Sequence, residues 1–270
     1  MNQRAIFITG GAGGMGVATG KRFADAGWKV GLFDLNQQAL DEAKSALEGG
    51  AVMTGVLDVT SSASFTQAVL DFSDFSGGRM DLLFNNAGIA PGGLLEDMSE
   101  ATIKSILEVN VMGVIHGIRA ALPLLKVTDN ALSMSTSSSV ATFGHAKRAV
   151  YTASKFAVKG LTEAMSLELE AYGIRSADVL PGCIDTPMLR EETAKGAGRP
   201  FELSMLNGLP QSGAYRLMPA TAIAEAVWSA YHDSDQIHFY VPEEVGDTDR
   251  VKALDIQAAR AEIKSFLYRG

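Results

Sequence analysis

Short apolar runs alternate along the chain with longer segments in which apolar residues recur every three or four positions. The apolar runs are predicted strands, at residues 5–8, 29–33, 51–57, 80–84, 131–136, 174–180 and 237–241. The periodic segments are predicted helices, near residues 14–26, 37–48, 61–72, 99–125, 151–171, 220–231 and 248–267. Strands that alternate with helices indicate an α/β fold, in which helices cover both faces of a parallel sheet.

One late segment interrupts this alternation. Residues 187–218 are rich in Gly and Pro and mix polar with apolar residues. Long irregular segments inside compact domains are often lids or binding loops. No internal repeat, low-complexity tract or linker divides the rest of the chain. We therefore predict one domain over residues 1–270, with a substrate-binding lid at 187–218.

The first predicted strand is followed directly by glycines. Residues 9–16 are TGGAGGMG, and an amphipathic helical pattern follows. Gly10 permits a tight turn, while Gly14 and Gly16 let the backbone and the helix N-terminus approach a pyrophosphate without a clashing Cβ. The next strand ends at Asp34, roughly 20 residues beyond, where a carboxylate can accept hydrogen bonds from ribose hydroxyls. The pattern predicts a dinucleotide site; the alternatives are an ordinary turn and a solvated strand-end acid.

A second candidate site lies in the middle of the chain. Tyr151 and Lys155 are four residues apart, so a helix places them on one face. A cation beside a phenol favours the phenolate, and we predict that the pKa of Tyr151 falls from about 10 toward neutrality. Such a tyrosine is a proton-transfer group. A hydroxyl from the upstream cluster Ser137, Ser138 and Ser139 could hold a substrate oxygen against it. The alternative is an ordinary pair on a helix surface.

These motifs occur together with Asn85-Asn86-Ala87-Gly88, which follows an apolar strand, and with Asn110. With Thr-Gly-x-x-x-Gly-x-Gly and Tyr-x-x-x-Lys in this order, the chain resembles the short-chain dehydrogenase/reductase family from about Ile6 to Val241. The resemblance implies a single-domain, Rossmann-type doubly wound parallel sheet of about seven strands. It also implies an NAD(P)-dependent oxidoreductase that transfers a hydride between the nicotinamide and its substrate.

The resemblance further assigns cofactor contacts. Asp34 is expected to hold the adenosine ribose, which favours NAD over NADP because the carboxylate would repel a 2′-phosphate and neither Gly13 nor Leu35 would attract one. Asp58 is expected to contact the adenine, with Val59 nearby, unless it serves only as a turn or cap residue. The predicted cofactor-binding residues are Thr9, Gly10, Gly14, Met15, Gly16, Asp34, Leu35, Asp58, Val59, Asn86, Ala87, Gly88, Tyr151, Lys155, Pro181, Gly182, Ile184 and Thr186.

The implied catalytic set is Asn110, Ser138, Tyr151 and Lys155. Tyr151 exchanges a proton with a substrate oxygen that Ser138 holds, and Lys155 stabilises the phenolate and holds the nicotinamide ribose. Asn110 bends its helix and holds a water that links the lysine to solvent, or has a structural role only. Ser138 is favoured over its two serine neighbours because it lies thirteen residues before Tyr151, although the following Val140-Ala141 departs from the more usual Ala-Gly.

The candidate substrate pocket is mostly apolar. It draws on residues 90–94 and 139–150 and on lid residues Met188, Leu189, Phe201, Met205 and Leu206. Such a lining favours a secondary alcohol or ketone, or an aldehyde. His145 could contact the substrate or remain solvated. Cys183 is expected to be a packing residue, because no histidine is placed to activate it.

The amino-acid composition indicates which kinds of molecule the protein binds. A net charge of −8 and a pI near 5.1 argue against nucleic acids and anionic membranes. No run of about 18 apolar residues suggests a membrane span, and too few residues precede the first strand for a signal peptide. A single cysteine is compatible with a reducing cytoplasm, and the spacing of the four histidines predicts no metal site. We predict a cytoplasmic protein that binds a small-molecule substrate.

Self-association is a further expectation from the resemblance. Helices that match 99–125 and 151–171 commonly pair in dimers and tetramers of the family, and a homotetramer is expected here. On the first helix, small residues would suit close helix packing; they are Gly113, Gly117, Ala120 and Ala121. The charged C-terminal helix near 248–267 is expected to cover the core or a neighbouring subunit.

Three other functions are open. An NADPH-dependent carbonyl or acyl-carrier ketone reductase keeps the fold, but Asp34 argues against it. A sugar epimerase of the family's longer form carries a larger C-terminal domain than 270 residues provide. A non-catalytic cofactor-sensing protein would be expected to lose the Tyr-x-x-x-Lys motif, which is intact here.

Overall fold

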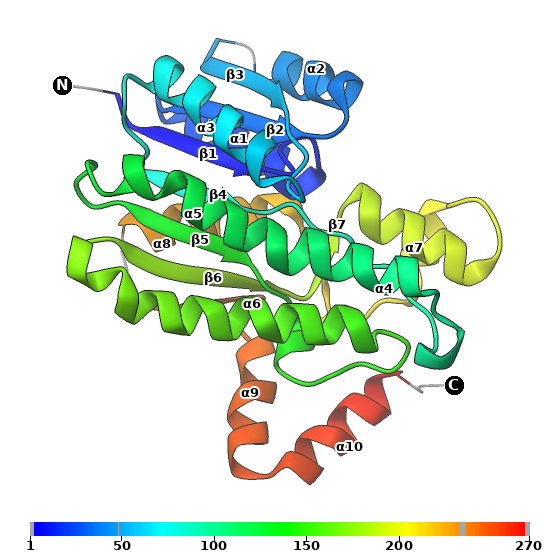
Figure 1. Cartoon of the computed structure of the whole chain (residues 1–270). Helices are drawn as coiled ribbons and strands as arrows, with labels where there is room; N and C mark the ends of the chain where they lie inside the picture. Colours follow the sequence, from blue (N-terminus) through cyan, green and yellow to red (C-terminus); the bar gives the residue numbers. More distant parts are fainter. Residues whose placement is uncertain (1–2, 48, 233–235, 268–270) are drawn as a thin grey trace.

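The fold is built on one parallel sheet, which the computed structural model describes over residues 3–47, 49–232 and 236–267 (Figure 1). The strand order is β3-β2-β1-β4-β5-β6-β9, and all six pairings are parallel. The strands are β1 (Ala5–Thr9), β2 (Lys29–Asp34), β3 (Ala51–Val56), β4 (Leu82–Asn85), β5 (Leu132–Thr136), β6 (Arg175–Pro181) and β9 (His238–Val241). The predicted doubly wound sheet of seven strands is confirmed.

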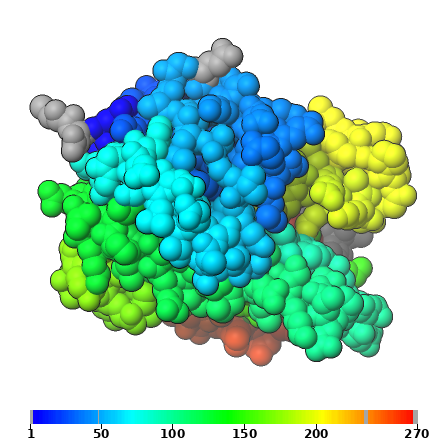
Figure 2. All heavy atoms as spheres, turned by 45° about the horizontal axis from the view of Figure 1, so that its top comes forward, coloured from blue at the N-terminus to red at the C-terminus, as the bar shows by residue number. Residues whose placement is uncertain are grey.

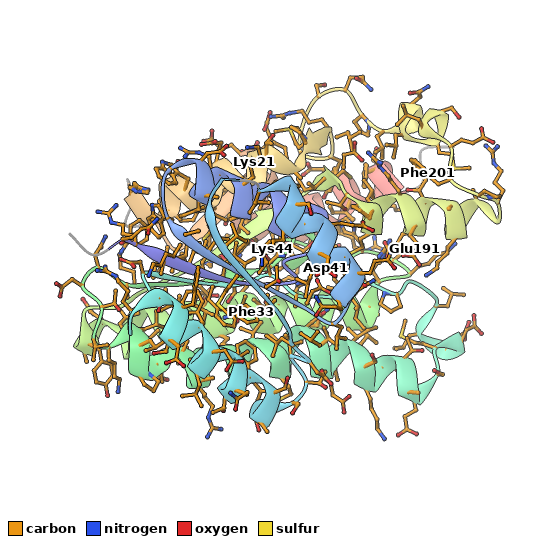
Figure 3. All side chains as sticks on the ribbon, turned by 90° about the horizontal axis from the view of Figure 1, so that it is seen from above. Lys21, Phe33, Asp41, Lys44, Glu191 and Phe201 are labelled. Atoms are coloured by element: carbon orange, nitrogen blue, oxygen red, sulfur yellow. The ribbon has the colours of Figure 1, made fainter. Side chains whose placement is uncertain are left out.

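Two layers of helices enclose the sheet, which Figure 3 shows edge-on between them. One layer holds α1 (Gly14–Asp25), α2 (Gln37–Ala46) and α8 (Ala220–His232). The other holds α3 (Ser62–Ser76), α4 (Glu100–Leu107), α5 (Gly113–Leu125) and α6 (Ala149–Glu168). The final residue of the helix predicted over 37–48 lies outside the described residues.

The sheet is buried on both faces, and β1 shows why its sequence is apolar throughout. Ile6 and Ile8 belong to the core beneath α1 and α8, whereas Ala5 and Phe7 belong to the core beneath α3 and α5. All four side chains are fully buried. A central parallel strand therefore has no solvent face, and its alternate positions do not alternate in polarity.

The helix predicted over 99–125 is present from Glu100 to Leu125, but it is not α-helical throughout. Between α4 and α5 lies a π-helical segment, Glu108–Met112, with Asn110 fully buried inside it. Such wide turns are rare and occur often at functional sites. The small residues of α5 also differ from expectation. A Cβ at Gly113 would lie 3.0 Å from Val59, and one at Gly117 would lie 2.2 Å from the amide oxygen of Asn85. These glycines therefore face the chain's own core instead of a neighbouring subunit.

The stretch Glu100–Leu125 is apolar enough to need comment. By length and composition alone it could cross a membrane, with a mean hydropathy of 1.3, although polar and charged residues interrupt its apolar positions. In the fold, Val114, Ile118 and Leu125 are buried against the sheet. The stretch is one of the helices that cover the sheet, which accounts for its apolar face.

The predicted irregular lid is largely ordered secondary structure. It contains α7 (Pro187–Ala197), a 3₁₀ turn (Leu203–Gly208) and β8 (Leu217–Pro219), which pairs with β7 (Cys183–Asp185). Thr186 caps α7 by accepting a hydrogen bond from the Leu189 amide, and proline follows at the first helical position. In Figure 2 the segment around α7, in yellow, projects from the body of the molecule beside the blue N-terminal segments.

The helix predicted over 248–267 is two helices, α9 (Val245–Leu254) and α10 (Ile256–Leu267). Asp255 separates them with an extended backbone, and its carboxylate accepts hydrogen bonds from the amides of Gln257 and Ala258. Aspartate favours such a cap over a helix interior. The bend turns α10 back along the molecule, where Ala259 and Ile263 are buried.

Candidate active site

The glycine segment after β1 forms a helix N-terminus without a side-chain cap. Gly13 is the N-cap residue of α1, no side chain bonds to the first amides, and the first turn carries no acid. Asn36 and Ser61, by contrast, cap α2 and α3 with their side chains. Because the first amides of a helix have no intrahelical acceptor, this end favours an anion.

The glycines are also required by close packing. Gly10 has φ of +61°, and a Cβ at Gly16 would lie 2.3 Å from the Gly10 carbonyl oxygen. A Cβ at Gly14 would lie 3.2 Å from both Thr186 and Pro187 at the start of α7. The glycine loop is therefore closely packed against itself, and it lies next to the first residues of helix α7.

Asp34 lies at the carboxyl end of β2, next to this loop. Its carboxylate accepts hydrogen bonds from the amides of Ala12, at 3.3 Å, and Asn36, at 3.2 Å. The side chain is half-buried, and the neighbouring Leu35 is 66% exposed. Uncapped amides and a carboxylate thus stand side by side, and this donor and acceptor set fits the pyrophosphate and ribose hydroxyls of a dinucleotide.

Asn86 fastens the glycine loop to the middle of the sheet. Its amide nitrogen donates to the carbonyl oxygens of Thr9 and Gly10, and its oxygen accepts from the Thr136 hydroxyl. The Thr9 hydroxyl in turn accepts from the amides of Asn86 and Ala87. The floor predicted for the cofactor is thus a hydrogen-bonded unit that joins β1, β4 and β5.

Asp58 follows β3 on the same rim of the sheet. One carboxylate oxygen accepts from both the amide and the hydroxyl of Thr60, while Ser61 caps α3. Asp58 therefore fixes this turn with one oxygen, and neighbouring Val59 is buried against Gly113.

Both the oxygen and the nitrogen of the Asn110 side-chain amide form hydrogen bonds within the protein. Its oxygen accepts from the Ile89 amide at 2.9 Å, and its nitrogen donates to the Ile89 carbonyl oxygen and to the Ser154 hydroxyl at 3.0 Å. This side chain joins the π-helical segment, the loop after β4 and helix α6. Its position between these elements accounts for a buried asparagine in an apolar stretch.

The structure separates the three adjacent serines. The Ser137 hydroxyl donates to the Lys155 carbonyl oxygen at 3.0 Å, which occupies it in holding α6. The Ser138 hydroxyl accepts from the Val140 amide, and it lies near enough to the Tyr151 phenol to lower the pKa of that group. Ser139 also lines the cavity, and its carbonyl oxygen accepts from the Thr142 hydroxyl. The thirteen-residue spacing therefore selects the serine that contacts Tyr151.

The predicted fall in the pKa of Tyr151 is wrong for this structure. Burial raises the pKa of the phenol, and the hydrogen bond from Ser138 and the charge of Arg148 lower it by less. The Lys155 ammonium lies 5.7 Å from the centre of the tyrosine ring and donates to the Thr136 carbonyl oxygen at 2.7 Å. Burial lowers the pKa of Lys155 to about 8, partly offset by Asp178. Desolvation is thus the largest influence on the pKa of both groups.

The lowered pKa of Lys155 predicts a pH-dependent difference in stability. Between about pH 8 and pH 10, the folded protein binds less of this proton than the unfolded chain, so its free energy of unfolding should rise with pH. Relative to Lys155→Met, the wild-type protein should gain roughly 1.4 kcal/mol per pH unit in this window. Urea unfolding of both proteins at pH 7, 8, 9 and 10 measures it. A constant difference would show that Lys155 titrates near its usual value.

Tyr151 faces an inner cavity of about 210 Å³. Its lining includes Ser138, Met15 from the start of α1, and Ile184 from β7. Pro181, Gly182 and Thr186 complete the wall that was predicted to contact the nicotinamide. Residues from the glycine loop, the serine cluster and the loop after β6 thus meet at one cavity, as their positions at the carboxyl ends of parallel strands predicted.

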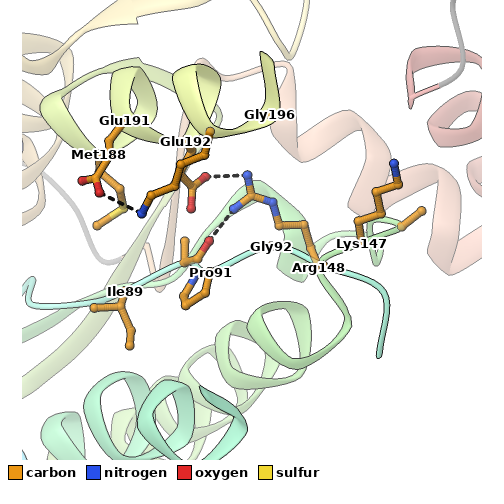
Figure 4. Close-up of a pocket in the computed structure, with 13 residues that line it drawn as sticks. Ile89, Pro91, Gly92, Lys147, Arg148, Met188, Glu191, Glu192 and Gly196 are labelled. Atoms are coloured by element: carbon orange, nitrogen blue, oxygen red, sulfur yellow. Dashed lines mark hydrogen bonds and ion pairs between the residues drawn. The ribbon is translucent and has the colours of Figure 1, made fainter. Parts of the chain in front are cut away.

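An outer cavity of about 840 Å³ adjoins the inner one (Figure 4). It lies between the loop after β4, the loop before α6 and helix α7, and Pro91, Lys147 and Lys195 contribute to its lining. Of the predicted lid residues, Met188 lines both cavities and Leu189 the inner one, whereas Phe201, Met205 and Leu206 line neither. The lid therefore contributes helix α7 to the site.

The inner cavity also includes residues that the sequence did not single out. Arg148 lies within the predicted segment 139–150, Glu192 and Tyr215 lie within the predicted lid, and Phe266 lies outside every predicted pocket segment. The Tyr215 and Phe266 rings stack at 3.8 Å, and the His145 ring lies 5.7 Å and 6.2 Å from them. We call these three residues the aromatic wall. Burial lowers the pKa of His145 to about 4, so its ring is neutral at pH 7. Cys183 also lines the cavity, and burial raises its pKa to about 11, which fits a packing role.

The chain is similar to known proteins over most of its length. The family described as short chain dehydrogenase matches residues 4–197. The chain is 37% identical over 190 residues to 2,5-dichloro-2,5-cyclohexadiene-1,4-diol dehydrogenase from Sphingobium indicum, covering 68% of this chain and 74% of the relative. It is 36% identical over 213 residues to 3-alpha-(or 20-beta)-hydroxysteroid dehydrogenase from Mycobacterium bovis, covering 75% and 80%.

A solved structure extends the likeness to nearly the whole fold. The short-chain dehydrogenase/reductase from Burkholderia phymatum in complex with NAD superposes with a TM-score of 0.80 at 26% identity, covering 95% of each chain. Fold and sequence together define a nicotinamide-dependent oxidoreductase of the Rossmann type. The chain belongs to the short-chain dehydrogenase/reductase family.

Proposed function

We propose that this protein is an NAD(H)-dependent dehydrogenase that interconverts secondary alcohols and ketones on apolar ring compounds. The observation that carries this proposal is the inner cavity, where Tyr151 and Ser138 meet the glycine-loop residue Met15. Asp34 supports NAD over NADP, because its carboxylate lies beside the uncapped α1 terminus and would repel a 2′-phosphate.

The roles of the catalytic residues follow from their positions. Ser138 holds the substrate oxygen against the Tyr151 phenol, which takes the proton from an alcohol or returns it to a forming alkoxide. Lys155 provides positive charge near the phenol, and Asn110 fixes the loop that follows β4. When bound, the nicotinamide supplies the hydride acceptor or donor. Because burial favours the neutral phenol, alcohol oxidation depends on charge from Lys155 and from bound groups.

The proposal of a ring substrate has two supports. Two stacked aromatic rings, those of Tyr215 and Phe266, line the inner cavity, and aromatic side chains supply a large apolar area for a ligand to bury. The names of two relatives also state ring compounds, a cyclohexadiene diol and a hydroxysteroid. Neutral His145 beside these rings favours an uncharged ligand.

Parallel titration with NADH and NADPH tests the cofactor assignment, followed by assay of cyclohexanol oxidation with NAD⁺. Tighter binding of NADH and turnover of cyclohexanol are expected. A preference for NADPH would contradict the Asp34 assignment and favour a reductase. Absence of binding by either nucleotide would contradict an enzymatic function altogether.

Phe266→Ala should reduce the preference for rings. We expect kcat/KM for cyclohexanol to fall about tenfold relative to 2-hexanol, which has the same number of carbons, because one of the two stacked rings that line the cavity is lost. Ile256→Ala is the control, since this residue of the same helix is 55% exposed. Equal losses for both alcohols would assign Phe266 a structural role and contradict the aromatic wall as a ring-binding surface.

Self-association into a dimer or tetramer remains part of the proposal. Leu107 at the end of α4 and Met112 before α5 are 40% and 42% exposed, and both lie on the helices that pair in relatives of the family. Sedimentation equilibrium decides between monomer, dimer and tetramer.

A further inference from the structure

An ion pair stands between the two cavities of the site. The inner and outer cavities share four lining residues, Ala90, Arg148, Met188 and Glu192. Arg148 and Glu192 are joined at 2.5 Å, and their side chains are only 31% and 20% exposed. Figure 4 shows the pair reaching across from the loop before α6 to helix α7. A ligand that extends from the inner cavity into the outer cavity therefore contacts Arg148 and Glu192.

Arg148 is fixed from two directions. Besides Glu192, its guanidinium donates to the Ala90 carbonyl oxygen at 2.7 Å. Arg148 precedes the first residue of α6, three residues before Tyr151, so its position is tied to the reacting end of the cavity. Two anchored donors in a planar guanidinium give this cation a defined place beside the substrate, as a flexible lysine would not.

The two charges act on the inner cavity in opposite directions. Arg148 lowers the pKa of Tyr151, His145 and Cys183, which line the inner cavity, and Glu192 raises that of Tyr151. The carboxylate thus offsets the positive field that Arg148 alone would impose there. An unpaired arginine in the same place would attract a carboxylate strongly, because charge-assisted bidentate pairs are the strongest hydrogen bonds that this side chain forms.

We propose that Glu192 is a specificity-determining residue that neutralises Arg148 at the wall of the inner cavity and thereby excludes substrates that carry a carboxylate. This inference rests on the proposed function and extends it, since it explains how an enzyme with an arginine in its substrate pocket selects uncharged alcohols and ketones. A carboxylate-bearing ketone would have to displace Glu192 and leave one carboxylate without its cation.

Two ketones with the same ring test the inference, cyclohexanone and 4-oxocyclohexanecarboxylate, which adds a carboxylate to that ring; each is reduced with NADH. In the wild-type protein, kcat/KM should favour cyclohexanone. In Glu192→Gln, the ratio of the two values should shift at least tenfold toward the carboxylate, since one charge-assisted contact becomes available to the substrate (about tenfold per 1.4 kcal/mol). The shift should disappear in Glu192→Gln combined with Arg148→Met.

Glu191→Gln is the matched control. Glu191 precedes Glu192 on α7, also lines the outer cavity, and pairs with Lys195 at 2.8 Å in an exposed position. Both substitutions remove one negative charge, but only Glu192→Gln releases Arg148. A similar shift in Glu191→Gln would assign the effect to net charge. An unchanged ratio in Glu192→Gln, or a wild-type preference for the carboxylate, would overturn the inference.

A binding measurement keeps this inference separate from the proposed function. If the wild-type protein reduced neither ketone, the proposed function would be contradicted. Calorimetry with cyclohexanecarboxylate would then decide the inference alone. Glu192→Gln should bind this anion at least tenfold more tightly than the wild-type protein or Glu191→Gln; equal affinities in all three would overturn it.

Discussion

Tyr151→Phe is expected to lower kcat for alcohol oxidation by about 10³-fold, the middle of the range for loss of a general acid or base. The substitution removes only the phenolic oxygen, and the ring that packs beside Ser138 and Lys155 remains. The Kd for NADH, followed by nucleotide fluorescence, should therefore change by no more than about twofold, because the loop contacts of the cofactor do not involve this oxygen.

Tyr172→Phe is the matched control for this substitution. Tyr172 lies in the 3₁₀ turn after α6 and is 54% exposed. It loses the same oxygen without any contact to the inner cavity, so kcat should equal that of the wild-type protein. Turnover retained in Tyr151→Phe would remove the tyrosine from its proposed role, and Ser138 would then need testing as the group that handles the proton.

The parts of the site that the sequence predicted well are those fixed by short segments. The glycine loop, Asp34 and Asn86 each follow a strand directly, and the carboxyl ends of parallel strands meet at one rim. Tyr151 and Lys155 are likewise fixed by the period of one helix. Local pattern and sheet direction were sufficient to bring these residues together.

The substrate side could not be predicted in the same way. Arg148 meets Glu192 across 44 positions of sequence, and Tyr215 stacks on Phe266 across 51. No periodicity links such residues, because their contacts depend on how α7 and α10 pack on the rest of the fold. The expectation of a mostly apolar pocket did not include the ion pair of Arg148 and Glu192, because that contact depends on where the lid helix packs.

The error over Tyr151 has a related cause. Four-residue spacing predicts that Lys155 lies on the same face, and it does. The direction of the pKa shift depends instead on how completely the fold removes both groups from water. Burial is a property of the assembled structure. The spacing therefore predicted that Lys155 neighbours Tyr151, but it could not predict that burial raises the pKa of the phenol.

The second large effect is expected at Asp34. Asp34→Ser should weaken NADH binding about tenfold, because the ribose hydroxyls lose a charged acceptor, and should strengthen NADPH binding about tenfold, because a 2′-phosphate no longer meets a carboxylate. The ratio of the two Kd values should therefore shift by about 100-fold. Asp34→Asn keeps an oxygen that can accept from the Ala12 or Asn36 amide, and it separates loss of charge from loosening of the loop.

Asp41→Ser is the control that removes one carboxylate away from the glycine loop. Asp41 lies on α2, is exposed, and accepts a hydrogen bond from Gln37. Its loss changes net charge as Asp34→Ser does but leaves the glycine loop and the end of β2 intact, so the ratio of the two Kd values should stay at the wild-type level. If Asp34→Ser weakened both nucleotides equally, the carboxylate would serve only to brace the loop. Nucleotide choice would then have to arise elsewhere on the rim, and the proposal of NAD as cofactor would lose its main support.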